Sequence, residues 1–123
     1  MGIKGRKAIV CASSKGLGRG CAIKLAEAGV DLTLNARSEG PLAETAEYIR
    51  DTFGVNVTTV ACDITTEEGR NKVLAAQGAP DILVNNAGGP PPGVWSDWGQ
   101  AEWEAAVQSN MLTPILLATA VLP

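Results

Sequence analysis

The sequence predicts an α/β fold built on a doubly wound parallel sheet. Short apolar runs rich in Val, Ile, Leu and Thr alternate along the chain with longer amphipathic segments, and Gly, Pro, Asn and Asp stand where one pattern gives way to the other. The short runs lack the polar alternation of a half-exposed sheet. We therefore expect the strands to be buried on both faces, as they are in parallel sheets.

Each expected element has a local signal. The two patterns predict strands at 7–12, 30–35, 56–62 and 81–85 and helices at 17–28, 41–53, 66–77 and 100–122. Pro41 opens the second helix, and Thr65-Thr66-Glu67-Glu68 offers the third a cap and N-terminal acids. Gly29 and Gly54 stand where helix C-caps are expected.

Size and charge narrow the classes of partner. A chain of 123 residues is one domain or part of one, and its net charge of -3 with scattered Lys and Arg gives no basic patch for nucleic acid. The longest apolar segment, 111–122, is interrupted by Thr113, Pro114 and Thr119, and the first residues lack a secretory pattern. We expect no nucleic-acid partner, no membrane partner and a cytoplasmic location.

The cysteines indicate neither a disulfide framework nor a metal site. Cys11, Cys21 and Cys62 are odd in number and lie far apart without CxxC spacing, and the chain contains no histidine. We interpret all three as small buried or helix-lining thiols.

The segment between the first expected strand and the first expected helix is the main candidate site. Glycines allow a sharp turn and close approach of a ligand, and a helix N-terminus points free N–H groups and a positive dipole at phosphate. Such loops also occur as plain connections in α/β proteins, so the motif needs support from elsewhere. The candidate cofactor-binding residues here are Ala12, Ser14, Lys15, Gly16, Leu17 and Gly18.

The end of the second expected strand bears on the choice between NAD and NADP. Arg37 stands about 20 residues after the glycine turn, with Ala36 in place of an acid. A carboxylate there would repel a 2′-phosphate, whereas a guanidinium pairs with it, and Lys15 adds a second positive charge. NADP(H) is therefore the preferred cofactor and NAD(H) a possible one. The alternative is that Arg37 is only a solvated charge at a strand end.

With two further motifs, these residues resemble the N-terminal half of the short-chain dehydrogenase/reductase family, of the 3-oxoacyl-carrier-protein reductase and glucose dehydrogenase type. Gly16 and Gly18 match the family's TGxxxGxG turn, although Cys11-Ala12 replaces the leading Thr-Gly. We expect Ala12 to meet this turn with a negative φ. Asn85-Asn86-Ala87-Gly88, directly after an apolar run, is the strongest match, and it argues against a methyltransferase-type fold.

The resemblance also implies roles for single residues. Asp63 and Ile64 stand where the family holds the adenine ring; Asn86 would tie strand ends together, while Ala87 and Gly88 let a ribose approach the backbone. Asn110 resembles the asparagine of the family's catalytic tetrad, which is thought to hold a water in a proton relay to a lysine. Apart from the family, Asp63 would be an ordinary cap and Asn110 a satisfied polar side chain.

The family's Tyr-x-x-x-Lys pair and its upstream serine have no counterpart in these 123 residues. In the family the lysine lowers the pKa of the tyrosine, whose phenol exchanges a proton with the substrate while hydride moves to or from nicotinamide. Tyr48 is the single tyrosine and has Thr52 four residues on, so we interpret it as a packing residue. None of the serines, at 13, 14, 38, 96 and 109, follows a fifth strand.

The resemblance implies that 1–123 is the N-terminal cofactor-binding half of a single Rossmann-type domain, with strand order 3-2-1-4 and an apolar edge at the fourth strand. We expect a fragment that is inactive alone, and marginally stable or self-associating. In the whole protein, hydride would pass between NADP(H) and a small carbonyl or alcohol substrate. Family habit implies a homo-oligomer that uses the last helix. The alternative is a non-catalytic nucleotide-binding or regulatory half-domain.

In the family the substrate loop lies mostly after the fifth strand, so the resemblance implies that only residues 89–98 of this half could contribute to a substrate site. Pro90, Pro91, Pro92 and Val94 with Trp95 and Trp98 form either a stiff apolar wall or a surface loop pinned by aromatic packing.

Overall fold

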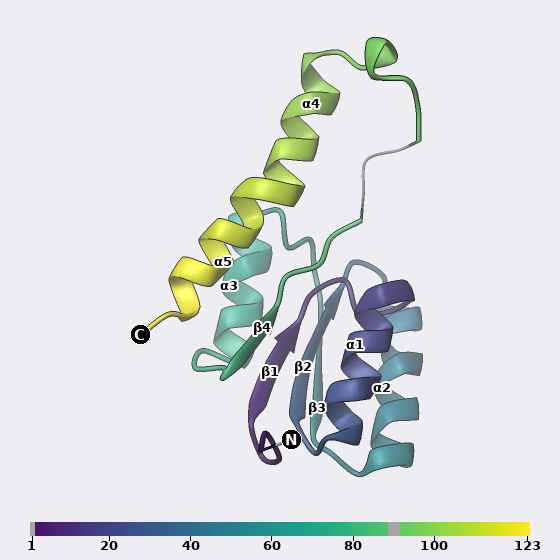
Figure 1. Ribbon diagram of the computed structural model, residues 1–123, viewed down its shortest axis with the longest axis vertical. Coiled ribbons are helices and arrows are strands. Elements are labelled where there is room, and N and C mark those ends of the chain that lie inside the picture. Colours follow the sequence, from purple (N-terminus) through teal and green to yellow (C-terminus); the bar gives the residue numbers. More distant parts are fainter. Residues whose placement is uncertain (1, 89–91) are drawn as a thin grey trace.

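The fold is a four-stranded parallel sheet with helices on both faces. The computed structural model describes residues 2–88 and 92–123. Its strands are β1 (Lys7–Val10), β2 (Asp31–Ala36), β3 (Val57–Ala61) and β4 (Ile82–Val84), in the order β3-β2-β1-β4 (Figure 1). The expected fold class and strand order are confirmed, and each strand lies within the expected range or one residue beyond it.

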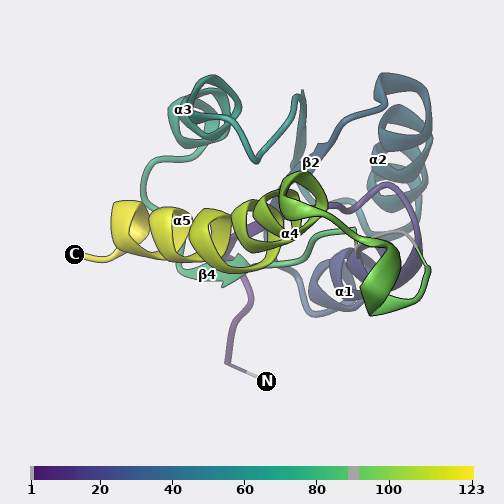
Figure 2. The same ribbon diagram turned by 90° about the horizontal axis from the view of Figure 1, so that it is seen from above.

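Two helices cover each face of the sheet. α1 (Gly16–Glu27) and α2 (Glu39–Phe53) lie on one side, and α3 (Glu67–Ala76) and α5 (Thr113–Val121) lie on the other (Figure 2). The pleat divides β1 between two cores, because successive side chains point to opposite faces. Ala8 and Val10 pack toward α1 and α2, whereas Ile9 and Cys11 pack with Val73 of α3 and Leu117 of α5.

The expectation that every strand is buried on both faces is wrong for β3. Val57 is buried, but Thr58, Thr59 and Ala61 are exposed. The reason lies in the topology: β3 is an outer strand of the sheet and has a neighbour, β2, on one side only. The β4 side chains are half-buried for the same reason, whereas β2 is buried from Leu32 to Ala36.

The helix signals in the sequence act largely as expected. The Thr66 hydroxyl caps α3 by accepting a hydrogen bond from the Gly69 N–H, at 3.0 Å. Gly54 ends α2 in the left-handed conformation with φ 69°, and Gly29 has φ 83° just after α1. α2 begins at Glu39, two residues earlier than expected, which leaves Pro41 within the first turn.

The last expected helix, 100–122, is not continuous. α4 (Gln100–Val107) leads into a five-residue π-helical segment, η2 (Gln108–Leu112), and α5 follows it. A π turn widens the helix by one residue per turn and changes which side chains face the sheet. Figure 1 shows α4 standing beyond the carboxyl ends of the strands, while α5 runs beside α3. Among the described residues, no helix combines the length and the hydropathy needed to cross a membrane.

Candidate functional site

A hollow of about 310 Å³ opens at the carboxyl ends of the strands. This is the end of a doubly wound sheet at which ligands bind, and the volume lies at the lower end of the range for small-molecule sites. Its walls come from the turn after β1, the ends of β2 and β3, the segment after β4 and one residue of η2. The lining residues are Ala12, Ser14, Lys15, Asn35, Ala36, Arg37, Ser38, Cys62, Asp63, Ile64, Thr65, Asn86, Ala87, Gly88 and Ser109.

Most of the residues that the sequence suggested lie together in this hollow. They are Ala12, Ser14, Lys15, Arg37, Asp63, Ile64, Asn86, Ala87 and Gly88. Gly16, Leu17 and Gly18 are instead the first three residues of α1, beside the hollow. Asn110 lies in η2 and does not line the hollow.

Gly18 lets the turn, α1 and the end of β4 meet closely. A Cβ at this position would lie 2.0 Å from the Ala12 carbonyl oxygen and 2.8 Å from Asn86 Nδ2. Asn86 Nδ2 in turn donates a hydrogen bond to that same carbonyl, at 3.3 Å. The contact joins the ends of β1 and β4, as the sequence predicted for Asn86. Gly18 therefore shapes the site without lining it.

The expected negative φ at Ala12 is wrong. Its φ is 48°, which places it in the left-handed region and makes it the single non-glycine residue with positive φ in the described part of the chain. A Cβ in this region crowds the following carbonyl, at a cost of roughly 1–2 kcal/mol. The turn keeps the backbone conformation that suits glycine, although the sequence supplies alanine. Strain of this kind is characteristic of functional sites.

The N-terminus of α1 is open toward anions. Lys15 is its N-cap residue, no side chain of the described residues caps it, and its first turn contains no acid. α3, by contrast, has the Thr66 cap and two acids, Glu67 and Glu68, in its first turn. Since unpartnered N–H groups and the helix dipole both favour negative charge, α1 is the helix end better suited to phosphate.

Opposite charges face the hollow from neighbouring strand ends. Arg37 follows β2 directly, and Asp63 follows β3 by two residues. The pKa of Asp63 is lowered from its ordinary value of 3.8, chiefly by hydrogen bonds from the Thr65 hydroxyl at 2.7 Å and the Thr65 N–H at 3.0 Å. The positive charge of Arg37 lowers this pKa further. The Asp63 carboxylate thus remains ionised at neutral pH.

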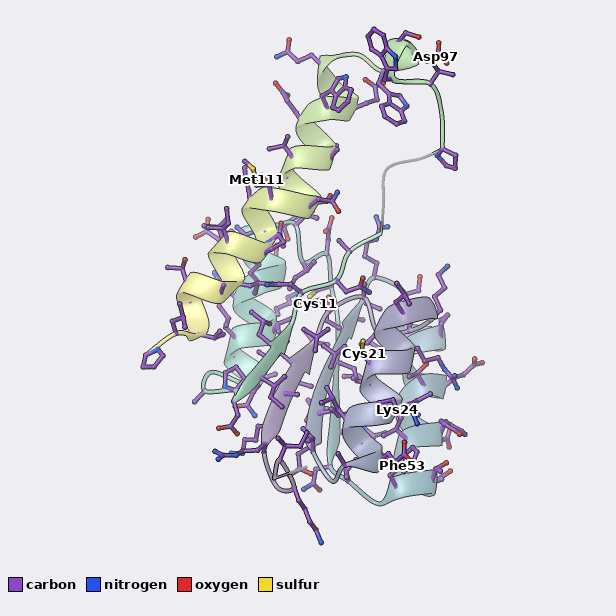
Figure 3. All side chains as sticks on the ribbon, viewed as in Figure 1. Cys11, Cys21, Lys24, Phe53, Asp97 and Met111 are labelled. Atoms are coloured by element: carbon purple, nitrogen blue, oxygen red, sulfur yellow. The ribbon has the colours of Figure 1, made fainter. Side chains whose placement is uncertain are left out.

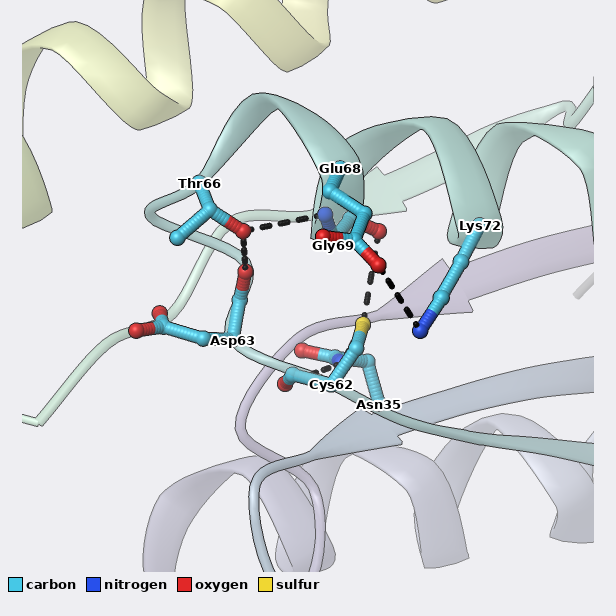
Figure 4. A network of polar contacts seen from close by, with 7 residues as sticks. All are labelled: Asn35, Cys62, Asp63, Thr66, Glu68, Gly69 and Lys72. Carbon is cyan, nitrogen blue, oxygen red and sulfur yellow. Dashed lines mark hydrogen bonds and ion pairs between the residues drawn. The ribbon is translucent and has the colours of Figure 1, made fainter.

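Asn35 and Cys62 line the hollow, although the sequence did not suggest either as a site residue. Asn35 is 2% exposed, and its Nδ2 donates to the Val60 and Cys62 carbonyls and to Cys62 Sγ. Cys62 Sγ also lies 3.3 Å from the Gly69 carbonyl, which connects this clamp to α3 (Figure 4). The available signal was an amide at the end of an otherwise apolar strand.

The three thiols differ in their surroundings. Cys11 is buried at the carboxyl end of β1 (Figure 3), and burial raises the pKa of its thiol to about 11. Burial also raises the pKa of Cys62, which is half-buried. Cys21 is exposed on α1. The interpretation as a buried thiol agrees with Cys11; Cys21 lies on a helix but is exposed, and Cys62 is only half-buried at the end of β3.

The η2 segment brings the C-terminal helix to the hollow. Ser109 lines the hollow, and the preceding residue, Gln108, donates a hydrogen bond from its Nε2 to the Thr65 carbonyl at 3.0 Å. Asn110 is exposed, and its Nδ2 donates to the Ala106 carbonyl at 3.0 Å. Sequence reasoning missed Gln108, Ser109 and Thr65; the available signal for the first two was that they directly precede Asn110.

The aromatic residues lie away from the hollow. Trp98 and Trp103 stack edge to face with ring centroids 5.5 Å apart, and Trp95 is 73% exposed. This favours the pinned surface loop over an apolar wall; Gly89, Pro90 and Pro91 lie outside the described residues. Tyr48 is half exposed, and the Arg19 guanidinium lies 5.1 Å from its ring centre. Tyr48 thus packs against Arg19 on the surface.

The fold and hollow define a dinucleotide-binding type of α/β domain, and residues 6–123 match the family model for short chain dehydrogenases. The chain belongs to this family.

Three relatives show the extent of the likeness. The chain is 31% identical to the uncharacterized oxidoreductase YvaG of Bacillus subtilis, over 95% of this chain and 45% of the relative. It is 35% identical to the 3-oxoacyl-acyl-carrier-protein reductase FabG of Vibrio harveyi, over 94% of this chain and 47% of the relative.

The structure of L-sorbose reductase from Gluconobacter frateurii, solved with NADPH and L-sorbose, superposes with a TM-score of 0.92 at 33% identity. The match covers 98% of this chain and 48% of the reductase. The chain thus spans about half the length of the relatives that it matches.

Proposed function

We propose that this chain is the NADP(H)-binding part of an oxidoreductase that transfers hydride between NADP(H) and a carbonyl or alcohol substrate. The observation that carries the proposal is the position of Arg37, which lines the same hollow as the turn before the uncapped end of α1. Ala36 precedes it, so no acid stands where a carboxylate would select against a 2′-phosphate. The NADPH bound to the related L-sorbose reductase supports the same cofactor.

The residues of the hollow fit the adenosine end of this cofactor. Arg37 and Lys15 supply positive charge for the 2′-phosphate, and the N–H groups at the start of α1 suit the pyrophosphate. We assign the adenine to Asp63 and Ile64, because Asp63 is an ionised acceptor at the edge of the hollow. Ala87 and Gly88 are small residues after β4 against which a ribose fits; a Cβ on Gly88 would meet no atom within 4 Å.

The cofactor, when bound, would donate or accept the hydride, and this chain supplies one polar residue for the chemistry. We propose that Asn110 takes part in proton transfer in the whole protein, since it occupies the family's asparagine position on the segment next to the hollow. The side-chain Oδ1 and the main-chain carbonyl oxygen of Asn110 are both acceptors that could hold a water. The partner groups named in the family, Ser, Tyr and Lys, have no counterpart here, so we expect no ketone-dependent oxidation of NADPH by these 123 residues alone.

Calorimetric titration with two adenosine nucleotides tests the cofactor assignment. Adenosine 2′,5′-bisphosphate and 5′-AMP differ only in the 2′-phosphate and need only the adenosine site. We expect the bisphosphate to bind at least tenfold more tightly, and Arg37→Ala to remove this preference, because a charge-assisted hydrogen bond contributes on the order of 1.5–3 kcal/mol.

Arg6→Ala is the matched control, because Arg6 lies at the other end of the sheet. There its Nη1 pairs with Asp81 Oδ1 at 3.3 Å. It removes the same charge without touching the hollow. Equal binding of both nucleotides by the wild type would contradict the NADP assignment. Binding of neither would contradict the proposal that this chain forms the adenosine site.

A further inference from the structure

The side chain of Gln108, the first residue of η2, reaches from the C-terminal helical region to a loop at the hollow. Its Nε2 donates to the Thr65 carbonyl at 3.0 Å, across 43 positions in sequence. The same carbonyl accepts a second hydrogen bond from Arg70 Nη1 at 2.9 Å. A carbonyl oxygen has two lone pairs, so both are engaged. Gln108 therefore completes the set of partners of this carbonyl.

The loop that Gln108 touches is otherwise held by its own neighbours. Asp63 Oδ1 accepts from the Thr65 N–H and hydroxyl, and the Asp63 carbonyl accepts from the Thr66 hydroxyl at 2.7 Å. These bonds fix the loop to the start of α3, but they do not connect it to α4 or η2. The link from Gln108 makes that connection.

The helical region around Gln108 is weakly held. Neither α4 nor η2 contains a buried residue. The π-helical segment η2 also interrupts the α-helical hydrogen bonding between α4 and α5. Few buried contacts and an irregular helix give low local stability. In the described part of the chain, Asn85 Nδ2 also donates a hydrogen bond to the Pro114 carbonyl at 3.4 Å, but this bond lies at the start of α5. Gln108 is thus the polar anchor of η2 at the hollow.

We infer that Gln108 is a positioning residue that couples nucleotide binding at the 63–65 loop to the order of η2, and so sets the positions of Ser109 and Asn110. The inference rests on the proposed function. Thr65 and Ser109 both line the hollow, and Gln108, the residue before Ser109, joins their two segments through its bond to the Thr65 carbonyl. A nucleotide that orders the loop therefore also orders η2, and the bond between Gln108 and Thr65 contributes to its affinity.

Hydrogen exchange with and without adenosine 2′,5′-bisphosphate tests the coupling in the full chain. In the wild type we expect the ligand to slow exchange of the amides at 105–112 by about fivefold or more. In Gln108→Met, which is nearly isosteric and lacks the donor, we expect no such protection at matched saturation. Its affinity should fall about fivefold, the factor that one net hydrogen bond supplies.

Gln100→Met is the matched control. Within residues 2–88 and 92–123, the Gln100 Nε2 donates only to Glu104 Oε1, at 2.7 Å and inside α4, so this variant should keep the ligand-induced protection. Circular dichroism and thermal unfolding show whether Gln108→Met folds. If it does not, Gln108→Asn replaces it, because the shorter amide keeps the polarity without the reach.

The two proposals fail in different ways. If the wild type binds no adenosine nucleotide, the proposed function is wrong, and the coupling falls with it. If the wild type binds but Gln108→Met keeps both the affinity and the protection of 105–112, the coupling is wrong and the proposed function stands. A loss of protection in Gln100→Met as well would show a general loosening of α4, which also contradicts a specific role of Gln108.

Discussion

At the scale of single residues, two glycines of α1 provide opposite tests of the turn. A Cβ on Gly18 would collide with the Ala12 backbone, whereas a Cβ on Gly20 would meet no atom within 4 Å. We expect Gly18→Ala to lower the free energy of unfolding by about 3 kcal/mol or more, because backbone atoms must move. We expect Gly20→Ala to raise it by about 1 kcal/mol through helix propensity. Urea unfolding measures both.

The comparison is internally controlled, since the two substitutions are chemically identical and lie two residues apart. Similar effects of the two variants, of either sign, would show that the turn does not meet α1 as closely as described.

The Cys11 thiol predicts a dependence of stability on alkaline pH. Burial raises its pKa from an ordinary value of 9.0 to about 11. A raised pKa means that the unfolded chain loses its proton first, so the stabilisation is complete below pH 9 and declines as the pH rises toward 11. We expect the wild type to lose about 2 kcal/mol more than Cys11→Ala between pH 8 and pH 11. Urea unfolding of both proteins at several pH values measures the difference.

Every other ionisable group is present in both proteins and therefore cancels in this difference. Parallel pH profiles would show that the Cys11 thiol is accessible to water.

Residues of the site could be predicted from the sequence where a local motif names them. Lys15, Arg37, Asp63 and Asn86 stand in such motifs close to strand ends, and all four line the hollow. The positive φ of Ala12 could not be predicted, because alanine ordinarily has a negative φ. Only the packing of Gly18 against the Ala12 carbonyl requires otherwise. Gln108 was missed because its role depends on a partner 43 residues away.

At the scale of elements, the starts of α2 and α3 differ in a testable way. Thr66 caps α3 with its hydroxyl, whereas Ser38, the N-cap residue of α2, makes no side-chain cap bond. We expect Thr66→Ala to cost about 1 kcal/mol of unfolding free energy and Ser38→Ala to cost only a few tenths. Thermal unfolding of the two variants measures the difference. Equal losses would mean that the Ser38 hydroxyl caps α2 in solution.

The helices and strands could be predicted because their signals are local: apolar period, caps and glycines. The π segment could not be predicted, since the pattern over residues 100–122 indicates one continuous helix. The break depends on how α5 packs on the sheet while Gln108 bonds to Thr65. The exposure of β3 was also missed. Its composition is that of a buried strand, and only its place at the edge of the sheet leaves its side chains in water.

At the scale of the whole molecule, one side of the chain is both apolar and uncharged. β4 pairs with β1 alone among the described strands, and residues 105–123 contain no Asp, Glu, Lys or Arg. Several large apolar side chains of this region are exposed; Met111 points away from the sheet (Figure 3). The exposed set is Val107, Met111, Leu112, Ile115, Leu116 and Leu122. Contiguous apolar surface beside an open strand edge favours association.

We therefore expect these 123 residues to self-associate in solution through the α4–α5 side. The association should depend on protein concentration and hardly on salt, because no charge takes part.

Leu116 is 45% exposed in the middle of this surface. Leu116→Lys should weaken association at least tenfold, because a buried ammonium without a partner is costly. Ala43→Lys, on the exposed side of α2, introduces the same charge elsewhere and should leave association unchanged. Sedimentation velocity over a hundredfold range of concentration measures all three proteins. A wild type that stays monomeric throughout that range would show that water alone covers this apolar side.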